Sequence, residues 1–328
     1  MLLPLLVEQI GLIYKRALVT GGAGFIGSHI CEELLKSGIE VVAIDDISAG
    51  YIDNVKSLCE YTNFQLVNVD ITNLHLLHKV LEGVDLVFHN AASKKNVCLK
   101  DPRRDLMVNA LGTFNVLECA VKAQVKKFVH ASTGSVYGEP QYVPQDENHP
   151  LHPISYYGVS KLAGERYVAL FDKLHDLNTT ILRYFHVYGS RQESNEYGGV
   201  VAIFIRNMLE GKIPTIFGSG KQERSFTYVK DVVASNLLVA IKDKETRNQV
   251  YNCASGDSIT IMDLLTALQN IFGNDFIPHY EDWVIGDIKK FNIDNSKITK
   301  LGMTFNLHLT ENLTETIKYY QDRFSRSM

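Results

Sequence analysis

Short apolar runs alternate with longer amphipathic segments along the first 185 residues of the chain. The runs are rich in β-branched residues and bounded by turn residues, as buried strands are. They lie at 17–19, 41–44, 64–69, 86–89, 128–130 and 180–182. Helix-length segments lie between them, for example at 25–37, 104–124 and 155–175. Strands that alternate with helices pair in parallel, so the pattern predicts an α/β fold with a doubly wound parallel sheet.

The alternation weakens after about residue 185. Helical stretches near 200–210, 230–241, 261–272 and 310–323 follow, separated by short extended pieces. No Pro/Gly-rich linker, internal repeat or low-complexity tract divides the two parts. We therefore predict a smaller α/β unit that closes over the sheet, mainly within residues 186–328, with a segment at about 225–255 returning to the first unit.

The first 15 residues form an apolar extension ahead of the first strand. Glu8 and Gln9 interrupt its apolar run, which is shorter than the ~20 residues that a membrane-spanning helix needs. No positive region precedes the run and no small-residue cleavage site follows it. We expect the extension either to pack on the body of the protein or to be poorly ordered, with weak membrane association as a further alternative.

Composition narrows the class of protein. A chain of 328 residues with 45% hydrophobic residues can bury a sizeable core. The formal net charge of -4 provides no basic patch for nucleic acid. The five cysteines are scattered, without CxxC or a His/Cys cluster at metal-ligand spacing. This pattern predicts a cytoplasmic protein without a metal site.

The stretch TGGAGFIGSH, residues 20–29, carries the first chemical signal. Gly21, Gly24 and Gly27 stand between a predicted strand and a predicted helix. Glycines at this spacing allow a tight turn, a close approach to a pyrophosphate and close packing of helix on strand, while the helix N-terminus binds the phosphates. The motif predicts a dinucleotide site of the Rossmann type, with Phe25 and Ile26 as further contacts.

Carboxylates at the ends of the next two strands refine the choice of dinucleotide. Asp45 follows Gly21 by 24 residues, where it can accept hydrogen bonds from the adenosine ribose hydroxyls. A 2′-phosphate would meet this charge and that of Asp46, so NAD is favoured over NADP; alternatively, Asp45 caps the following loop. Asp70 is either an adenine contact or a turn cap. Residues 1–185 are thus predicted to be a Rossmann-type NAD-binding domain, and residues 186–328 mainly a substrate-binding domain.

Several longer motifs give a resemblance. They are GGAGFIG, HNAA at 89–92, NALGT at 109–113, STGSVYG at 132–138, YGVSK at 157–161, RYFHVYGSRQ at 183–192 and RSFTYVKDV at 224–232. From Ala17 to about Tyr320, the chain resembles the extended short-chain dehydrogenase/reductases of the NAD-dependent epimerase/dehydratase family. The resemblance implies further NAD contacts at Ile71, Ala91, Lys94, Asn109, Ser132 and Tyr184.

Tyr157 and Lys161 share one face of a predicted helix because they are four residues apart. A phenol with a pKa of about 10 is a poor base at neutral pH. A nearby ammonium and a positive nicotinamide ring both favour the phenolate. Thr133, at the end of the fifth predicted strand, would hold the substrate oxygen and share its proton with Tyr157. In the family, the residue matching Lys161 also holds the nicotinamide ribose.

The resemblance implies oxidation of a nucleotide-bound sugar, usually at C4. In the dehydratases that this chain resembles, an Asp and a Glu directly follow the catalytic Thr, and a decarboxylase usually keeps the Glu. Gly134 and Ser135 occupy these positions here. Without groups for elimination, the keto sugar would rotate and take hydride back on its other face. The prediction is an NAD-dependent nucleotide-sugar 4-epimerase, with UDP-glucose and UDP-galactose as first candidates.

The resemblance also implies a substrate site. Its residues are Thr133, Ser135, His186, Val200, Val201, Arg224, Lys289 and Phe291. Arg224 matches an arginine that clamps the substrate diphosphate, or else forms a surface ion pair. Two departures are His186, where the family has Asn, and Val284, where it often has Arg, so one diphosphate contact is lost or passes to a lysine. Phe291 falls beside C2 of the sugar and disfavours N-acetyl groups.

Two other hypotheses stay open. One is a different nucleotide-sugar enzyme of the family, such as a 4,6-dehydratase, a dehydrogenase or another epimerase, with His186 as a candidate group. The other is a sensor of NAD or sugar nucleotide that does not turn substrate over, although sensing alone would not need the set of Thr133, Tyr157 and Lys161. The family also implies a homodimer, because segments 104–124 and 155–175 are long enough to form its helical bundle.

Overall fold

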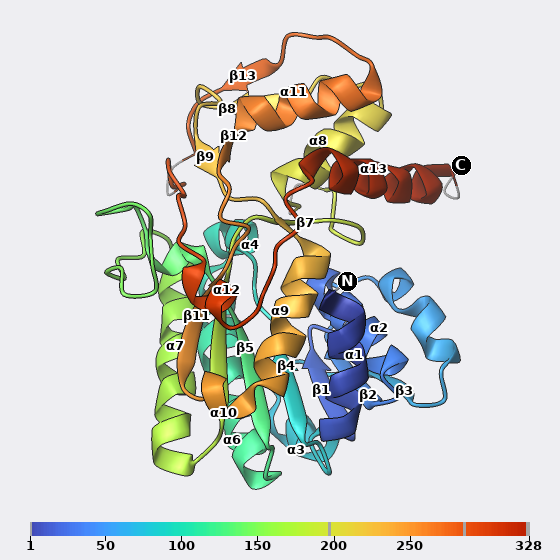
Figure 1. Cartoon of the computed structure of the whole chain (residues 1–328), viewed down its shortest axis with the longest axis vertical. Helices are drawn as coiled ribbons and strands as arrows, with labels where there is room; N and C mark the ends of the chain where they lie inside the picture. Colours follow the sequence, from blue (N-terminus) through green and yellow to red (C-terminus); the bar gives the residue numbers. More distant parts are fainter. Residues whose placement is uncertain (1, 196–197, 285–286, 326–328) are drawn as a thin grey trace.

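The computed structural model describes residues 2–195, 198–284 and 287–325. Its centre is a seven-stranded parallel sheet of order β11-β6-β5-β4-β1-β2-β3 (Figure 1). The strands are β1 (Arg16–Thr20), β2 (Glu40–Asp45), β3 (Phe64–Asn68), β4 (Leu86–His89), β5 (Lys127–Thr133), β6 (Thr179–Tyr184) and β11 (Gln249–Cys253). The first six coincide with the six apolar runs of the sequence, although β3 ends one residue before its run does, so the predicted doubly wound parallel sheet is confirmed.

Helices cover both faces of this sheet (Figure 1). One layer contains α1 (Leu2–Ile13), α2 (Phe25–Lys36) and α9 (Val229–Ile241), and the other contains α3 (Leu74–Val80), α6 (Thr113–Lys122) and α7 (Tyr156–His175). Successive residues of a strand point to opposite faces, so Ala17 and Val19 pack in the first layer and Leu18 in the second. Burial on both faces explains why the strands are continuously apolar.

The N-terminal extension is a helix that packs on the body, the first of the alternatives above. Leu6, Val7 and Ile10 of α1 are buried against α2 and α9. The Tyr14 hydroxyl donates a 2.8 Å hydrogen bond to the carbonyl of Ala240 at the end of α9. Among the described residues, no helix has the length and apolar character to cross a membrane.

The later residues build a second apolar cluster beyond the carboxyl ends of the central strands (Figure 1). It joins α8 (Val200–Leu209), α11 (Ile261–Phe272) and α13 (Leu309–Ser325) with β7 (Val187–Tyr188), β8 (Thr215–Phe217) and β10 (Thr227–Tyr228). The remaining elements are α4 (Lys95–Lys100), α10 (Asp243–Thr246), α12 (Ser296–Lys300), β9 (Glu223–Arg224), β12 (Ile259–Thr260), β13 (His279–Glu281) and short 3-10 turns at 52–54, 56–60 and 134–136. The domain boundary at residue 185 stays a prediction.

The predicted helix over 104–124 is interrupted in the structure. It is divided into α5 (Pro102–Leu106), a π-helical stretch from Met107 to Gly112, and α6. A Cβ atom at Gly112 would come within 2.6 Å of the Ile71 side chain. The stretch therefore packs directly on the loop after β3, and that tertiary contact is invisible in a helical pattern. Single π turns inside helices often mark functional sites.

Candidate active site

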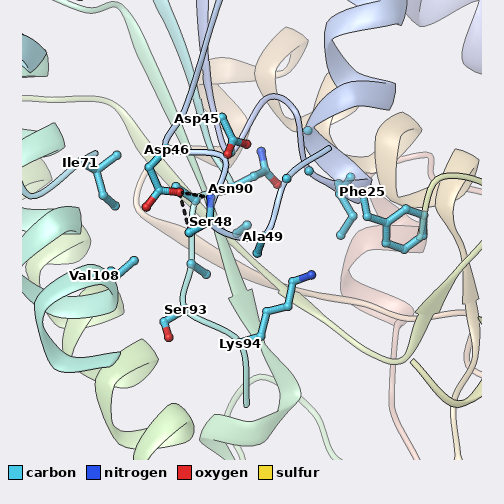
Figure 2. A pocket seen from close by; sticks show the side chains of 18 of the residues that line it. Phe25, Asp45, Asp46, Ser48, Ala49, Ile71, Asn90, Ser93, Lys94 and Val108 are labelled. Atoms are coloured by element: carbon cyan, nitrogen blue, oxygen red, sulfur yellow. Dashed lines mark hydrogen bonds between the residues drawn. The ribbon is translucent and has the colours of Figure 1, made fainter. Parts of the chain in front are cut away.

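A cavity of about 370 Å³ opens at the carboxyl ends of the central strands. In Figure 2, Asp46, Ile71 and Val108 lie at one end and Phe25 at the other. Its lining includes most of the predicted cofactor residues, namely Gly21, Gly24, Phe25, Ile26, Gly27, Asp45, Asp70, Ile71, Ala91, Lys94, Ser132, Tyr157, Lys161 and Tyr184. Asn109 is not part of the lining; its buried amide is bonded to Ser93, Asp105 and Ser160.

The glycine turn between β1 and α2 forms one wall of the cavity. Gly21 has a φ of 65°, a conformation that other residues rarely adopt. A Cβ atom at Gly27 would lie 2.1 Å from the Gly21 carbonyl oxygen. Helix α2 has no side-chain cap at Gly24, so its first N–H groups remain for an anion. This bare backbone cradle fits the diphosphate of NAD.

Asp45 closes the loop after β2 and also lines the cavity. Its carboxylate accepts hydrogen bonds from the backbone N–H of Ala23 at 3.0 Å and of Ile47 at 2.9 Å. Burial raises the pKa of Asp45, while these two N–H groups act in the opposite direction. The two interpretations of Asp45 are compatible, because a carboxylate offers about four lone-pair sites and two remain for ribose hydroxyls.

Arg104 was not foreseen from the sequence, yet it lines the cavity together with Asp46 and Asp70. It forms ion pairs with Asp46 at 2.8 Å and with Asp70 at 2.9 Å. The other oxygen of Asp70 accepts hydrogen bonds from the N–H and hydroxyl of Thr72, both at 2.8 Å. Burial alone would raise the pKa of Asp70, but the Thr72 hydrogen bonds and the Arg104 charge lower it. Asp70 is therefore a turn cap that also faces the cavity.

A second ion pair crosses from the loop after β4 to the segment after β7. The Lys94 ammonium lies 2.6 Å from the Glu193 carboxylate, and both residues line the cavity. Glu193 is buried, as is its neighbour Gln192, which also lines the cavity. Neither Glu193 nor Gln192 was singled out from the sequence as a site residue. Their segment belongs to the smaller apolar unit, so both parts of the molecule contribute to the cofactor wall.

Tyr157 and Lys161 lie on α7 and both line the cavity. The Lys161 ammonium donates a 2.6 Å hydrogen bond to the carbonyl of Ala131. Burial lowers the pKa of Lys161 to about 8, although Glu165 and Asp105 favour the charged form. Burial raises the pKa of the Tyr157 phenol, while a hydrogen bond with Thr133 acts against this. These effects together favour the neutral phenol, whereas a positive charge close to the ring would favour the phenolate.

Thr133 ends β5 beside this pair. Its hydroxyl oxygen accepts a 3.1 Å hydrogen bond from the backbone N–H of Ser135 and donates to the Ser135 hydroxyl at 3.3 Å. A Cβ atom at Gly134 would lie 2.2 Å from the ring of Phe185. The backbone at residue 134 is therefore pressed against an aromatic ring and has no room for a side chain.

A buried polar network packs behind β5, the strand that ends at Thr133. The Ser132 hydroxyl donates to Glu165 at 2.5 Å, and Arg183 donates to both oxygens of Glu165 at 2.9 and 2.8 Å. Arg183 also donates to the Tyr137 hydroxyl at 2.8 Å, which donates to Asn252 at 2.7 Å. Ser132, Glu165, Arg183 and Asn252 come from β5, α7, β6 and β11, and Tyr137 follows the 3-10 turn at 134–136. All five side chains are buried, so the network ties these elements to one another.

The predicted substrate residues lie outside the lining of this cavity, and Thr133 and Ser135 are among them. Arg224 is paired with Asp287 at 2.7 Å and lies over the ring of Phe291. Phe291 is buried and packs edge-on against His186, with ring centroids 4.8 Å apart. The backbone of Lys289 donates to Glu139. Val200 and Val201 begin α8. His186 has a φ of 34°, a left-handed value that is uncommon for residues other than glycine.

Comparison with known proteins identifies this arrangement. A family model described as the NAD dependent epimerase/dehydratase family matches residues 17–254. The chain belongs to this family. NAD is accordingly its cofactor, in agreement with the glycine cradle and Asp45.

Similar sequences and solved structures align with almost the whole chain. A UDP-glucose 4-epimerase of Mycolicibacterium smegmatis is 35% identical over 94% of this chain and 99% of its own length. The solved structure of a UDP-glucose 4-epimerase from Thermotoga maritima with UDP-glucose has a TM-score of 0.88 and 36% identity, over 94% of this chain and 99% of that one. A UDP-glucuronic acid 4-epimerase from Bacillus cereus with UDP-glucuronic acid and NAD has a TM-score of 0.88 and 34% identity, with the same coverage. The two solved relatives share the fold of this chain, and each is bound to a UDP-sugar.

Proposed function

We propose that the protein is an NAD-dependent nucleotide-sugar 4-epimerase, with UDP-glucose and UDP-galactose as its first candidate substrates. The reaction would pass through a transient 4-keto sugar. Bound NAD would supply a positive ring charge that favours the Tyr157 phenolate, together with the capacity to accept hydride from C4 and give it back. The named relatives, which are UDP-sugar 4-epimerases, support this proposal.

The chain's own residues would perform the proton chemistry. Tyr157 would take the proton of the C4 hydroxyl, within reach of the Thr133 hydroxyl that already bonds it. Lys161, whose pKa of about 8 keeps most of its charge at neutral pH, would hold the ribose beside the ring and favour the phenolate. Lys161 is buried and Tyr157 is half-buried at the cavity wall, so water screens the attraction between the two groups less than it would at the open surface.

The observation that carries the choice of epimerisation is the surface next to Thr133. Elimination at C5 and C6 needs an acid and a base beside the keto sugar. Gly134 has no space for a side chain because Phe185 fills it, and Ser135 carries only a hydroxyl, which bonds Thr133. The buried carboxylate of Glu165 is fully engaged with Ser132 and Arg183, and that of Asp105 is bonded to Asn109 and Cys98. With no free carboxylate at these positions, rotation and re-reduction is the simplest fate of the keto sugar.

The substrate side supports a hexose nucleotide. Arg224 would bind the diphosphate in exchange for its present partner Asp287. Val200 and Val201 would cover the base from the first turn of α8. The ring of Phe291, held by His186 and Phe185, is a rigid wall that would disfavour a bulky N-acetyl group. Ser135 and Lys289 would complete the site.

We also propose a cytoplasmic homodimer. Exposed apolar residues follow one face of α7, with Val159, Tyr167, Leu170 and Leu174 between 39% and 70% exposed. Leu111 on the neighbouring π-helical stretch extends this face. A continuous apolar face on a long helix is typical of an interface. All five cysteines lie among the described residues and are free thiols, which suits a reducing compartment. Sedimentation equilibrium should give the mass of a dimer, and a monomer would contradict the proposed interface.

A substrate panel tests the proposed reaction. Purified protein would be incubated separately with UDP-galactose, UDP-glucose, UDP-N-acetylglucosamine and UDP-glucuronic acid, and the products analysed by NMR and mass spectrometry. We expect the C4 epimer of UDP-galactose or UDP-glucose with unchanged mass. A product lighter by one water would show a dehydratase, and one lighter by carbon dioxide a decarboxylase. The Tyr157→Phe variant serves as the inactive control.

A further inference from the structure

Arg104 joins the ends of two neighbouring strands across the adenosine end of the cavity. Its Nη2 donates to Asp46, directly after β2, at 2.8 Å, and its Nη1 lies 2.9 Å from Asp70, soon after β3. Both carboxylates line the same cavity as Asp45 and Arg104; Figure 2 shows Asp45 and Asp46 there. Arg104, Asp46 and Asp70 are each about one third exposed, so the bridge stands at the solvent edge of the cavity.

The two aspartates after β2 differ in what holds them. Asp45 is buried and receives two backbone N–H groups, so it is fixed in place. Asp46 uses one oxygen for the N–H and hydroxyl of Ser48, and its other oxygen for Arg104. Asp46 is thus the more exposed of the two carboxylates and is the one that neutralises a guanidinium.

A guanidinium fork is the side chain best suited to bind a phosphate dianion. In dinucleotide-binding folds, an acidic residue after the second strand binds the ribose 2′-hydroxyl, whereas a nearby arginine accommodates a 2′-phosphate. This chain has both kinds of group at one end of one cavity. Asp46 and Asp70 each bind one nitrogen of the Arg104 guanidinium. Together with Asp45 they place three negative charges beside this one positive charge.

We propose that Asp46 excludes the 2′-phosphate of NADP by holding Arg104, so that Arg104 is a masked phosphate-binding residue. Asp46 acts in two ways: it adds a negative charge beside Asp45, and it occupies the hydrogen-bond donors that a phosphate would need. Asp45 alone sets the preference for a free ribose hydroxyl. Asp46 and Arg104 make that preference strong. The inference concerns cofactor choice only and does not depend on the sugar substrate.

The test measures which dinucleotide the protein binds, without turnover. Wild-type protein and variants are dialysed to equilibrium against equimolar NAD and NADP, and the bound nucleotides are released and quantified by chromatography. The variants are Asp46→Ala, Arg104→Met and the double variant. Asp53→Ala, which removes an exposed carboxylate from the nearby 3-10 turn at 52–54, is the matched control for charge alone.

We expect Asp46→Ala to raise the bound NADP-to-NAD ratio roughly tenfold to a hundredfold, the range of one charge-assisted hydrogen bond. The double variant should lose most of that gain, and Asp53→Ala should match the wild type. An unchanged ratio in Asp46→Ala would overturn the proposal, as would a gain that the double variant keeps, because Arg104 would then have no part in it. Should Asp46→Ala fold poorly, Asp46→Ser gives the same comparison while retaining a hydroxyl near Ser48.

Discussion

Glu165 gives the most quantitative test of how the site is supported. Its carboxylate and the Arg183 guanidinium are each 3% exposed and share two hydrogen bonds. The Glu165→Ala variant would leave a buried guanidinium without its counter-ion and the Ser132 hydroxyl without its acceptor. Removing one partner of a buried ion pair costs about 3–5 kcal/mol of unfolding free energy. That is a large part of the ~5–15 kcal/mol that stabilises a typical domain.

Urea unfolding followed by circular dichroism measures this cost. The matched control is Glu118→Ala, which removes a carboxylate from an exposed i,i+4 pair with Lys122 on α6 and should cost at most about 0.5 kcal/mol. A second comparison replaces the pair by apolar side chains, Glu165→Leu with Arg183→Met, which should destabilise less than Glu165→Ala alone because no charge stays buried. If Glu165→Ala costs under about 1 kcal/mol, the desolvation reasoning is wrong.

Three further expectations concern the cofactor, the base and acid sensitivity. Gly27→Val should distort the glycine turn and abolish NAD binding, because a Cβ atom would lie 2.1 Å from the Gly21 carbonyl oxygen; normal NAD content after denaturation and chromatography would contradict this. Tyr157→Phe should retain NAD and lose roughly 100-fold or more in turnover, and near-normal turnover would exclude its role as base. Burial lowers the pKa of His29 to about 4, of His89 to about 3, and of His130 well below its ordinary 6.5. The unfolded state therefore binds protons first, and unfolding free energy should fall by about 1.4 kcal/mol per pH unit for each histidine as the pH drops below 6.5 toward 4; urea midpoints that do not fall from pH 7 to pH 5 would contradict it.

The sheet and the cofactor cradle were predictable because local physics determines them. Apolar runs and amphipathic segments arise because those residues are buried in the fold. Six strands of the central sheet therefore lie at the apolar runs of the sequence. The glycine turn was predictable for the same reason. Gly21 is required by its positive φ, and Gly27 by its close approach to the Gly21 carbonyl, six residues earlier in the chain. Tyr157 and Lys161 are one helical turn apart, so their shared face follows from helix geometry.

The residues that sequence reasoning missed are those placed by contacts between distant segments. Arg104 is separated from Asp46 by 58 positions, and no local pattern links the two. Glu193 reaches Lys94 only because the smaller unit folds back over the sheet. The break in the predicted helix over 104–124 has the same origin, because Gly112 packs on Ile71 across the layer. Long-range packing decides these positions, and hydrophobic periodicity does not record it.

The most direct measurement of the central claim uses UDP-galactose labelled with deuterium at C4. A 4-epimerase that oxidises C4 and re-reduces the same carbon should give UDP-glucose that keeps its deuterium at C4, with no net NADH in solution and no change in mass. Loss of the label to solvent, accumulation of NADH, or a product that has lost water would contradict the account.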